Sequence, residues 1–303
     1  MTPEPHVARV PGSGADALVE HDGTGVVRTS AGAFLRLQHP PAGLADALTG
    51  APAGDDESGA YAAKLTAEMA AREAADAERR WPAARRNVGL VGEGALIEAL
   101  ADALTGWGVA PARFPDGAAL LAAPGADPAG GDLPDAAAGD RPGAAPPWDL
   151  VIAYADTPAA RAGWDALDSL PGHGAAWLRA YREGQVCFVD PISLSTDDPT
   201  AEQVRRRRLA ASTVPRELDA WQRAAAGSAE ELPTAARTLV AARILTVALA
   251  WAQRADTLET YRGTLWKLVA ATGTLSEHPV LAYDPPPALP ASRAAGGGAA
   301  RPS

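Results

Sequence analysis

Two glycines one residue apart, Gly92 and Gly94, mark the stretch whose residue types and spacing come closest to a known chemistry. Between a buried strand and a helix, such glycines let a nucleotide phosphate approach the backbone N–H groups of the helix N-terminus. A dinucleotide motif needs a third glycine, which lets the helix pack closely on the strand, and Ile97 stands at that position. The turn therefore predicts a strand-to-helix crossover rather than a phosphate site, and we expect no bound cofactor. Asp116 lies where a ribose-binding carboxylate would, in a stretch that favours a solvent-exposed turn.

Thiol and imidazole chemistry has little support in this sequence. The chain has a single cysteine, Cys187, and 5 histidines that are scattered along it. A structural zinc site needs four Cys or His ligands at short, regular spacings, so we expect no metal. Cys187 lies between valine and phenylalanine in the run QVCFVDP, which predicts a small buried side chain rather than a nucleophile.

Four consecutive arginines, Arg205 to Arg208, form the strongest charge cluster in the chain. Consecutive residues point in different directions around a helix, so at most two of them share a face. We expect a solvated helix whose arginines make local ion pairs, because exposed charge pairs contribute little. Contact with an acidic peptide or partner is the alternative interpretation.

The elements that position these residues fall into two groups. Short strands separated by turns come first, followed by a brief helical stretch and a long, charged helix with a narrow apolar stripe at Leu65 and Met69. The strands are predicted at His6 to Val10, Ala17 to Glu20, Val26 to Thr29 and Phe34 to Leu37, and the helices at Leu44 to Leu48 and Tyr61 to Arg80.

From residue 85 onward the pattern alternates between strands and helices, which is typical of an α/β domain with a parallel sheet. A stretch rich in Ala, Gly, Pro and Asp, residues 122–147, cannot build a core and is expected to be a flexible insertion. The remaining elements are predicted at Val88 to Val91, Asp149 to Tyr154, Ala176 to Pro191 (two strands), Val204 to Leu218 (helix), Ala236 to Trp251 (buried helix), and Thr264 to Ala270 with Thr274 to Leu281 (hairpin).

Composition narrows the classes of function. The 303 residues are 47% hydrophobic but only 5% aromatic, which predicts an aliphatic core. A formal charge of −10 argues against a nucleic-acid partner, because such partners require a basic surface. The sequence has no apolar run of about 18 residues and no signal-like start. We therefore expect no membrane association and a cytoplasmic protein.

Three stretches, taken in order, resemble the ThiF-like, ubiquitin-activating-enzyme-like partner proteins of YcaO cyclodehydratases, found in azole and thiopeptide biosynthesis. They are the glycine turn VGLVGEGALIEALADAL; the run from DLVIAYADTP to AWLRAYREGQVCFVDPISL, followed by VRRRRLAAS; and the ending GTLSEHPVL. The resemblance covers roughly residues 85–283. Many members hold zinc through two C-x-x-C pairs, and the corresponding stretches here, DDPTAEQV and AYDPPPALP, contain no cysteine. The chain thus resembles a degenerate, non-catalytic member.

The resemblance implies a fold and a domain plan. A small winged-helix-like α+β module would be followed by a degenerate ThiF-like, doubly wound (Rossmann-type) domain. The corresponding ranges are 1–58 for leader-peptide recognition, 59–84 for a bridging helix, 85–284 for the scaffold domain with its insertion at 122–147, and 285–303 for a disordered tail.

The implied function is capture of the leader of a ribosomally made precursor peptide and its presentation to a YcaO enzyme, which forms the azoles with ATP. A homodimer is left open. A nucleotide-binding enzyme, adenylating or NAD(P)-dependent, with an altered glycine turn remains the alternative.

A disordered leader gains most by adding a strand to an exposed sheet edge. We expect that edge at Phe34 to Leu37, with Arg36 facing an acidic leader residue; a purely structural role for the apolar residues is the alternative. The full set of expected peptide-binding residues is Val26, Val27, Phe34, Leu35, Arg36, Leu37, Leu65 and Met69.

Overall fold

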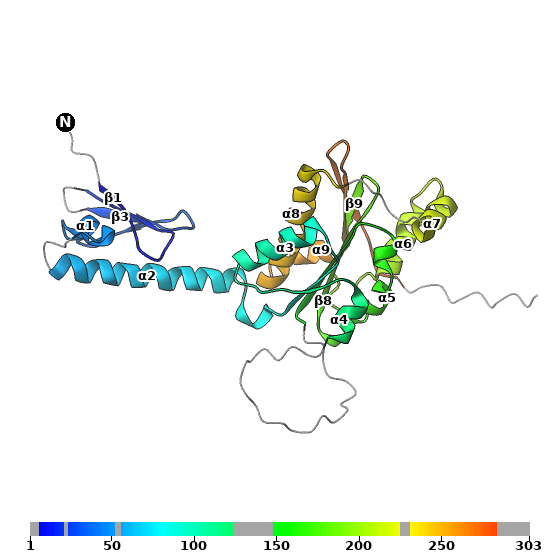
Figure 1. The fold of residues 1–303 in the computed structure, drawn as a ribbon, viewed down its shortest axis with the longest axis horizontal. Coiled ribbons are helices and arrows are strands. Elements are labelled where there is room, and N and C mark those ends of the chain that lie inside the picture. Colours follow the sequence, from blue (N-terminus) through cyan, green and yellow to red (C-terminus); the bar gives the residue numbers. More distant parts are fainter. Residues whose placement is uncertain (1–5, 21–23, 52–55, 124–147, 225–230, 284–303) are drawn as a thin grey trace, which may run out of the picture. The chain divides into compact units, whose positions relative to one another are not determined.

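The structure is a computed structural model that describes residues 6–20, 24–51, 56–123, 148–224 and 231–283. Two compact units divide the chain: unit 1 comprises 1–86, 103–110 and 251–255, and unit 2 comprises the rest. Figure 1 shows the helices and strands of both units. All but two residues of the insertion expected at 122–147, and the whole tail expected at 285–303, lie outside the described residues.

Unit 1 begins with a four-stranded antiparallel sheet in which each strand pairs with the next along the chain. The register sets Val26 opposite Arg36 and Val27 opposite Leu35, so alternate residues of the last two strands face opposite sides. The sheet therefore has one apolar face and one mixed face. Its strands are β1 (His6–Arg9), β2 (Asp16–Val19), β3 (Gly25–Arg28) and β4 (Phe34–Arg36).

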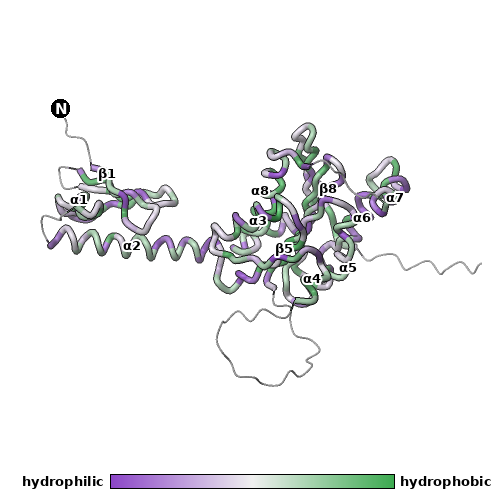
Figure 2. Tube along the Cα trace, viewed as in Figure 1, coloured by the Kyte–Doolittle hydropathy of each residue, from purple (hydrophilic) through white to green (hydrophobic). Residues whose placement is uncertain are grey.

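Two helices cover the apolar face of this sheet, α1 (Leu44–Thr49) and α2 (Asp56–Arg80). Gly50 ends α1 with φ +77°, a backbone conformation that glycine adopts at little cost. In α2 the buried residues are Ser58, Ala62, Leu65 and Met69, spaced at helical intervals on one face, and the hydropathy of the tube alternates accordingly (Figure 2). The helix begins five residues before the expected Tyr61, because Ala62 is buried in the core of unit 1 and Ser58 is buried beside Gly43.

The C-terminal end of α2 runs into a cluster of three tryptophans within unit 1. The buried Trp81 ring lies 6.2 Å from that of Trp107 and 6.1 Å from that of Trp251. The Arg85 guanidinium stacks over Trp251 at 5.0 Å and donates to the Trp251 carbonyl. Aromatic burial of this kind anchors the end of an otherwise exposed helix.

Unit 2 is built on a seven-stranded mixed sheet in the order β11-β10-β9-β8-β7-β5-β6. Pairing is parallel from β6 to β8 and antiparallel from β8 to β11. Every residue of β5 and β7 is buried, as expected of parallel strands covered on both faces. The strands are β5 (Val88–Val91), β6 (Ala112–Phe114), β7 (Leu150–Ala155), β8 (Ala176–Glu183), β9 (Val186–Val189), β10 (Thr264–Val269) and β11 (Thr274–Pro279). The α/β class is thus confirmed, as a small antiparallel sheet plus a mixed sheet.

The helices of unit 2 lie on both faces of this sheet (Figure 1). Leu120, Leu167 and Val204, from α4, α5 and α6, pack in one core with the odd-numbered residues of β7. The longer helices α3 and α8 lie on the other side. Their bounds are α3 (Ala95–Gly106), α4 (Gly117–Ala122), α5 (Trp164–Leu167), α6 (Ala201–Ala210), α7 (Pro215–Ala224), α8 (Thr234–Gln253) and α9 (Leu258–Arg262).

One sequence-based expectation for unit 2 was wrong. The helix predicted over Val204 to Leu218 is two helices, α6 and α7, because the chain turns after Ala210 and Pro215 starts a new helix. After β7 the chain forms a single 3-10 turn, Ala159–Arg161, followed by the short helix α5. Short helical turns therefore connect β7 to β8 in place of a full crossover helix.

Helix α8 is also long and apolar enough to pass for a membrane span by length and composition. Half of its most apolar stretch is buried within the protein, and Val240, Ile244 and Val247 belong to the core. The core helix of a soluble protein has these properties.

Candidate functional site

The residues expected to bind a peptide lie on both faces of the small sheet of unit 1. Val27, Leu37, Leu65 and Met69 are buried in its core, and Leu35 packs against that core. Val26, Phe34 and Arg36 lie on the opposite face, where Phe34 is 68% exposed. Phe34 and Leu35 therefore cannot form one apolar strip, because neighbouring strand residues point to opposite sides. Only the outer group is accessible from the open face of the sheet.

Strand β4 is an edge strand whose outward backbone groups are available. Among the described residues, it pairs with β3 on one side and with no strand on the other. Leu37 N–H donates to the Gly25 carbonyl at 2.9 Å and Thr29 N–H to the Ala33 carbonyl at 2.8 Å. Because antiparallel pairing alternates, Leu35 bonds to β3 while the N–H and C=O groups of Phe34 and Arg36 point to the open edge. An incoming strand would thus find two residues with both backbone groups free.

A groove of about 420 Å³ runs beside this edge, with α2 as its second wall. The Tyr61 hydroxyl donates to the Gln38 carbonyl at 3.1 Å and marks one end of the open edge. Partial burial raises the Tyr61 pKa above its usual value, so the hydroxyl stays a neutral donor. Leu65 lines the groove and Met69 does not. The lining residues are Arg36, Leu37, Gln38, His39, Tyr61, Lys64, Leu65 and Glu68.

In unit 2, the glycine turn has the geometry that the sequence predicted. Gly92 has φ +120°, and a Cβ at this position would lie 2.3 Å from the Tyr154 carbonyl oxygen. Its N–H donates to the Phe114 carbonyl at 2.9 Å. Gly94 has φ +92° and leads into α3, where Ile97 is buried. Gly92 is therefore required by its backbone conformation and by close packing, and Gly94 by its backbone conformation alone, independently of any ligand.

A hollow of about 740 Å³ lies at this turn, at the carboxyl ends of β5, β6 and β7. Ligands of open α/β sheets bind at this position. Glu93, Asp116 and Asp156 line it, and among the described residues it has no lysine, arginine or histidine lining. Three carboxylates repel a phosphate, so the lining disfavours a nucleotide.

Two of these carboxylates have structural partners. Asp116 caps α4, accepting from Ala119 N–H at 2.8 Å. Asp156 accepts from the Tyr154 hydroxyl at 2.8 Å and pairs with Arg182 at 2.6 Å. Burial raises the pKa of Tyr154 far above its usual value, as does the charge of Asp156. The carboxylates thus stabilise the turn and strand ends on which they lie.

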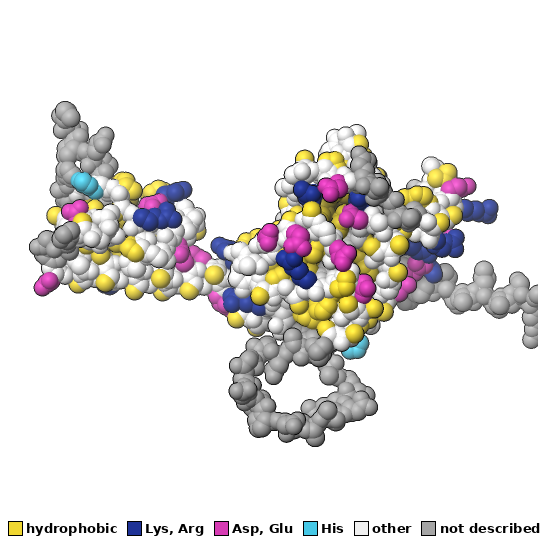
Figure 3. All heavy atoms as spheres, in the orientation of Figure 1, with side chains coloured by type: hydrophobic (Ala, Val, Ile, Leu, Met, Phe, Trp, Pro, Cys, Tyr) yellow, Lys and Arg dark blue, Asp and Glu magenta, His cyan; other side chains and the backbone are white. Residues whose placement is uncertain are grey.

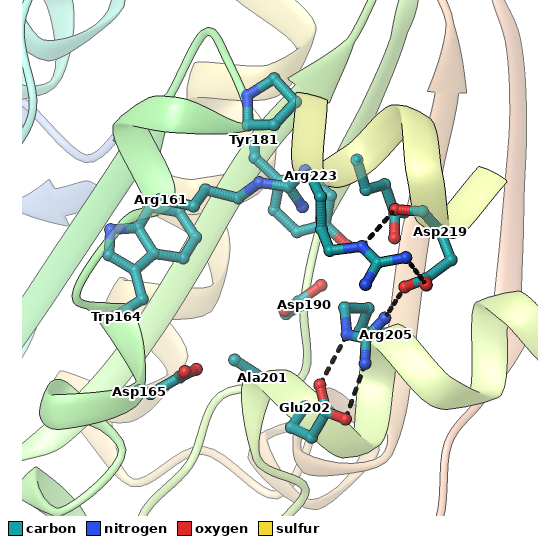
Figure 4. A pocket seen from close by; sticks show the side chains of 12 residues that line it. Arg161, Trp164, Asp165, Tyr181, Asp190, Ala201, Glu202, Arg205, Asp219 and Arg223 are labelled. Atoms are coloured by element: carbon teal, nitrogen blue, oxygen red, sulfur yellow. Dashed lines mark hydrogen bonds and ion pairs between the residues drawn. The ribbon is translucent and has the colours of Figure 1, made fainter. Parts of the chain in front are cut away.

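A third hollow, of about 430 Å³, lies where α5, α6 and α7 meet β8 and β9 of unit 2 (Figure 4). Asp190 lies at the centre of the labelled side chains, and basic side chains gather over α6 and α7 on the face shown (Figure 3). Its lining residues are Pro158, Arg161, Trp164, Asp165, Tyr181, Asp190, Ala201, Glu202, Arg205, Asp219, Gln222 and Arg223.

A buried ion-pair network supports this hollow. Glu183 accepts from Arg208 Nη1 at 2.9 Å, from Arg161 at 3.0 Å and from Gln222 at 3.0 Å. Burial raises the pKa of Glu183, but the hydrogen bonds and charge of Arg208, with those of Arg161, outweigh burial and hold the pKa below its usual value. The Arg208 guanidinium also stacks over Phe188 at 3.8 Å.

The arginine cluster singled out from the sequence is used within the chain. Arg205 pairs with Glu202 and Asp219, Arg206 with Glu202, and Arg208 with Glu183. The expectation of local ion pairs on a solvated helix is confirmed for Arg205 and Arg206, which pair with Glu202 of the same helix, and is wrong for Arg208, which is buried against Glu183 of β8. The rest of the network was missed, although arginines inside the apolar strand AWLRAYRE were a signal: a charge in a buried strand requires a partner.

Cys187 is fully buried, and burial raises the pKa of its thiol to about 11, so it is a core residue as expected. Within the described ranges, no group of three or more His, Cys, Asp or Glu side chains is placed to hold a metal ion.

Comparison with known proteins gives structural similarity only. No family model matches the chain, and a search of curated proteins finds no match. Among solved structures, it is similar to a heterocyclase in complex with substrate and cofactor (13% identity, TM-score 0.41, 92% of this chain and 37% of that one) and to the heterocyclase TruD (12%, 0.41, 92% and 41%). It is also similar to a chain of the E. coli microcin synthetase McbBCD complex with pro-MccB17 bound (12%, 0.46, 92% and 97%). The chain spans about two fifths of the two heterocyclases, and likeness at this level transfers no activity.

Proposed function

We propose that this protein binds the leader of a ribosomally synthesised precursor peptide and presents it to a YcaO-type cyclodehydratase that forms azolines and azoles from Cys, Ser and Thr. The chain itself acts as a non-catalytic partner. One observation carries the proposal: the open edge of β4, with the backbone groups of Phe34 and Arg36 free, borders a groove whose other wall is α2.

This edge suits a disordered peptide for a thermodynamic reason. Ordering an unfolded segment costs conformational entropy, and main-chain hydrogen bonds to a sheet edge offset that cost for many sequences. Specificity then comes from side chains that enter the groove beside the strand. Arg36 lines it and favours an acidic leader residue, Lys64 pairs with Glu68 at 3.9 Å, and Leu65 offers an apolar contact.

The non-catalytic role rests on the glycine-turn hollow of unit 2. Its three carboxylates and the absence of a basic lining residue in the described chain disfavour ATP, the cosubstrate an adenylating enzyme would need. A nucleotide-binding enzyme is the second candidate, favoured only by the position of that hollow at the strand ends.

The two candidates are separated by paired titrations of the full-length protein. In fluorescence anisotropy, we expect saturable binding of a labelled leader from the precursor encoded in the same gene cluster, and no saturable response to ATP, NAD or NADP in a thermal-shift assay. A leader that fails to bind would contradict the recognition role. Saturable nucleotide binding without leader binding would establish the second candidate.

A further inference from the structure

Among the described residues of helix α8, one exposed face carries no charge. Between residues 235 and 246, the exposed positions recur at i, i+3, i+4, i+7 and i+11, so they lie on one side of the helix. They are Ala235, Thr238, Leu239, Ala242 and Thr246. The most apolar stretch of α8 is only half buried within the protein, and Leu239 is 41% exposed. A helix at the surface of a globular protein normally places charged residues on its outer side, so this face is unusual for a helix that contacts only water.

The two threonines on this face do not need water as a hydrogen-bond acceptor. The Thr238 hydroxyl donates to the Thr234 carbonyl at 3.0 Å, and the Thr246 hydroxyl donates to the Ala242 carbonyl at 2.8 Å. A donor that is satisfied within its own helix can be covered without losing a hydrogen bond. The face can therefore be buried at little polar cost.

The charged residues of α8 are engaged elsewhere. Arg243 pairs with Glu277 of β11 at 3.0 Å, and Arg237 donates to the Thr234 hydroxyl at 3.4 Å. Leu275 lies on the same face of β11 as Glu277, because it is two residues away, and is 51% exposed. The apolar surface of α8 thus continues onto the neighbouring β10–β11 hairpin (Figure 1).

We propose that this face of α8 packs against the same face of a second copy of the chain and forms a symmetric dimer. Apolar residues at these spacings on an exposed helix are typical of a helix that packs against another helix. Charged residues beside such a seam normally select or reject partners. Arg243, one turn from Leu239, is already neutralised by Glu277, so like charges do not oppose pairing with an identical copy.

The size of the face sets the expected strength of the dimer. From Ala235 to Thr246 it extends for about 17 Å, since each helical residue rises by about 1.5 Å. A standard protein interface buries about 800 Å² on each partner, which is more than one helix face of this length provides. We therefore expect a reversible dimer with a dissociation constant in the micromolar range rather than an obligate one.

Sedimentation velocity of the full-length protein, between about 2 and 200 μM, tests the proposal. We expect the average mass to rise with concentration from one chain toward two. A mass of one chain at every concentration would overturn the proposal and leave this face to another occupant. Growth beyond two chains would also contradict it, because a symmetric pair closes.

Variants locate the interface. Leu239→Glu places a carboxylate near the middle of the face in both copies and should weaken the dimer at least tenfold. Leu121→Glu makes the same change at a leucine of α4 that is 50% exposed, and should change the dissociation constant less than twofold. If near-UV circular dichroism shows that Leu239→Glu is unfolded, Ala242→Lys replaces it with the same expectation. Unchanged dimerisation in a folded variant would contradict the interface.

The dimer is independent of leader capture. The face of α8 belongs to unit 2 and the groove beside β4 to unit 1. Failure of the dimer prediction therefore leaves the proposed function intact.

Discussion

The groove beside β4 and the hollow at the glycine turn are both open to solvent, but their linings differ. The groove lies along a sheet edge and suits a peptide strand, whereas the hollow lies at the ends of parallel strands and disfavours a phosphate. The groove offers the outward backbone N–H and C=O groups of β4 together with Arg36, whereas its Lys64 pairs with Glu68. The hollow lies where open α/β sheets bind nucleotides but is lined by three carboxylates. Position in a fold therefore did not decide what each region can bind; the donors, acceptors and charges that line it did.

Substitution of Gly92 in the glycine turn should have the largest effect, on the stability of the protein. Gly92→Ala places a Cβ 2.3 Å from the Tyr154 carbonyl oxygen at φ +120°, so the free energy of unfolding should fall by about 3 kcal/mol. Gly184→Ala, at φ +59° in open space, is the matched control and should cost about 1 kcal/mol. Chemical denaturation measures both. Equal losses would show that close packing at Gly92 is unimportant and that its turn is free for a ligand.

Blocking the β4 edge should have the next largest effect, on binding rather than stability. Phe34→Pro removes an outward N–H, which an edge strand tolerates, and should weaken the leader about tenfold, or ~1.4 kcal/mol. Phe34→Ala is the control: it removes the side chain but keeps that N–H, so any further weakening in Phe34→Pro comes from the lost backbone hydrogen bond. Anisotropy titrations compare the two variants after thermal melts confirm folding. If both bind alike, strand addition at this edge is wrong.

The acidic lining of the glycine-turn hollow predicts that ATP does not bind, and one substitution tests this further. ATP should produce no saturable thermal shift in the wild type, and Glu93→Gln should not create one, because Asp116 and Asp156 remain. Isothermal calorimetry provides an independent measurement. ATP binding that is lost in Gly94→Val would show that the turn holds a phosphate and would reverse the comparison between the two regions.

Reversing the charge of Arg36 in the groove beside β4 should have the smallest effect on leader binding. Arg36→Glu should weaken an acidic leader about threefold and leave stability within about 0.5 kcal/mol, because the side chain is exposed. Arg9→Glu makes the same change on the opposite edge strand, where Arg9 pairs with Asp16 at 3.2 Å, and should leave leader affinity unchanged. Similar losses in both variants would indicate a general electrostatic effect rather than contact at β4. Added salt should reduce the Arg36 effect.

The sequence by itself determined the features that depend on neighbours along the chain. The strand at Val88 to Val91, the turn at Gly92 and the hairpin around Thr272-Gly273 were predicted, because buried strands are apolar throughout and tight turns need glycine. The burial of Cys187 and of α8 followed from the same local patterns. The edge at Phe34 to Leu37 was predicted as well, but the set of residues expected there does not distinguish the core face, with Leu35 and Leu37, from the outer face, with Phe34 and Arg36.

Only the tertiary structure decided which charged side chains meet. Asp190 follows β9, Arg205 lies in α6 and Gln222 in α7, and nothing in their sequence separation shows that they line one hollow. The same holds for the start of α2, which extends to Asp56 because the sheet of unit 1 buries its first turns. Burial and turn geometry are set by local chemistry, whereas the partners of a buried charge depend on which distant elements pack together.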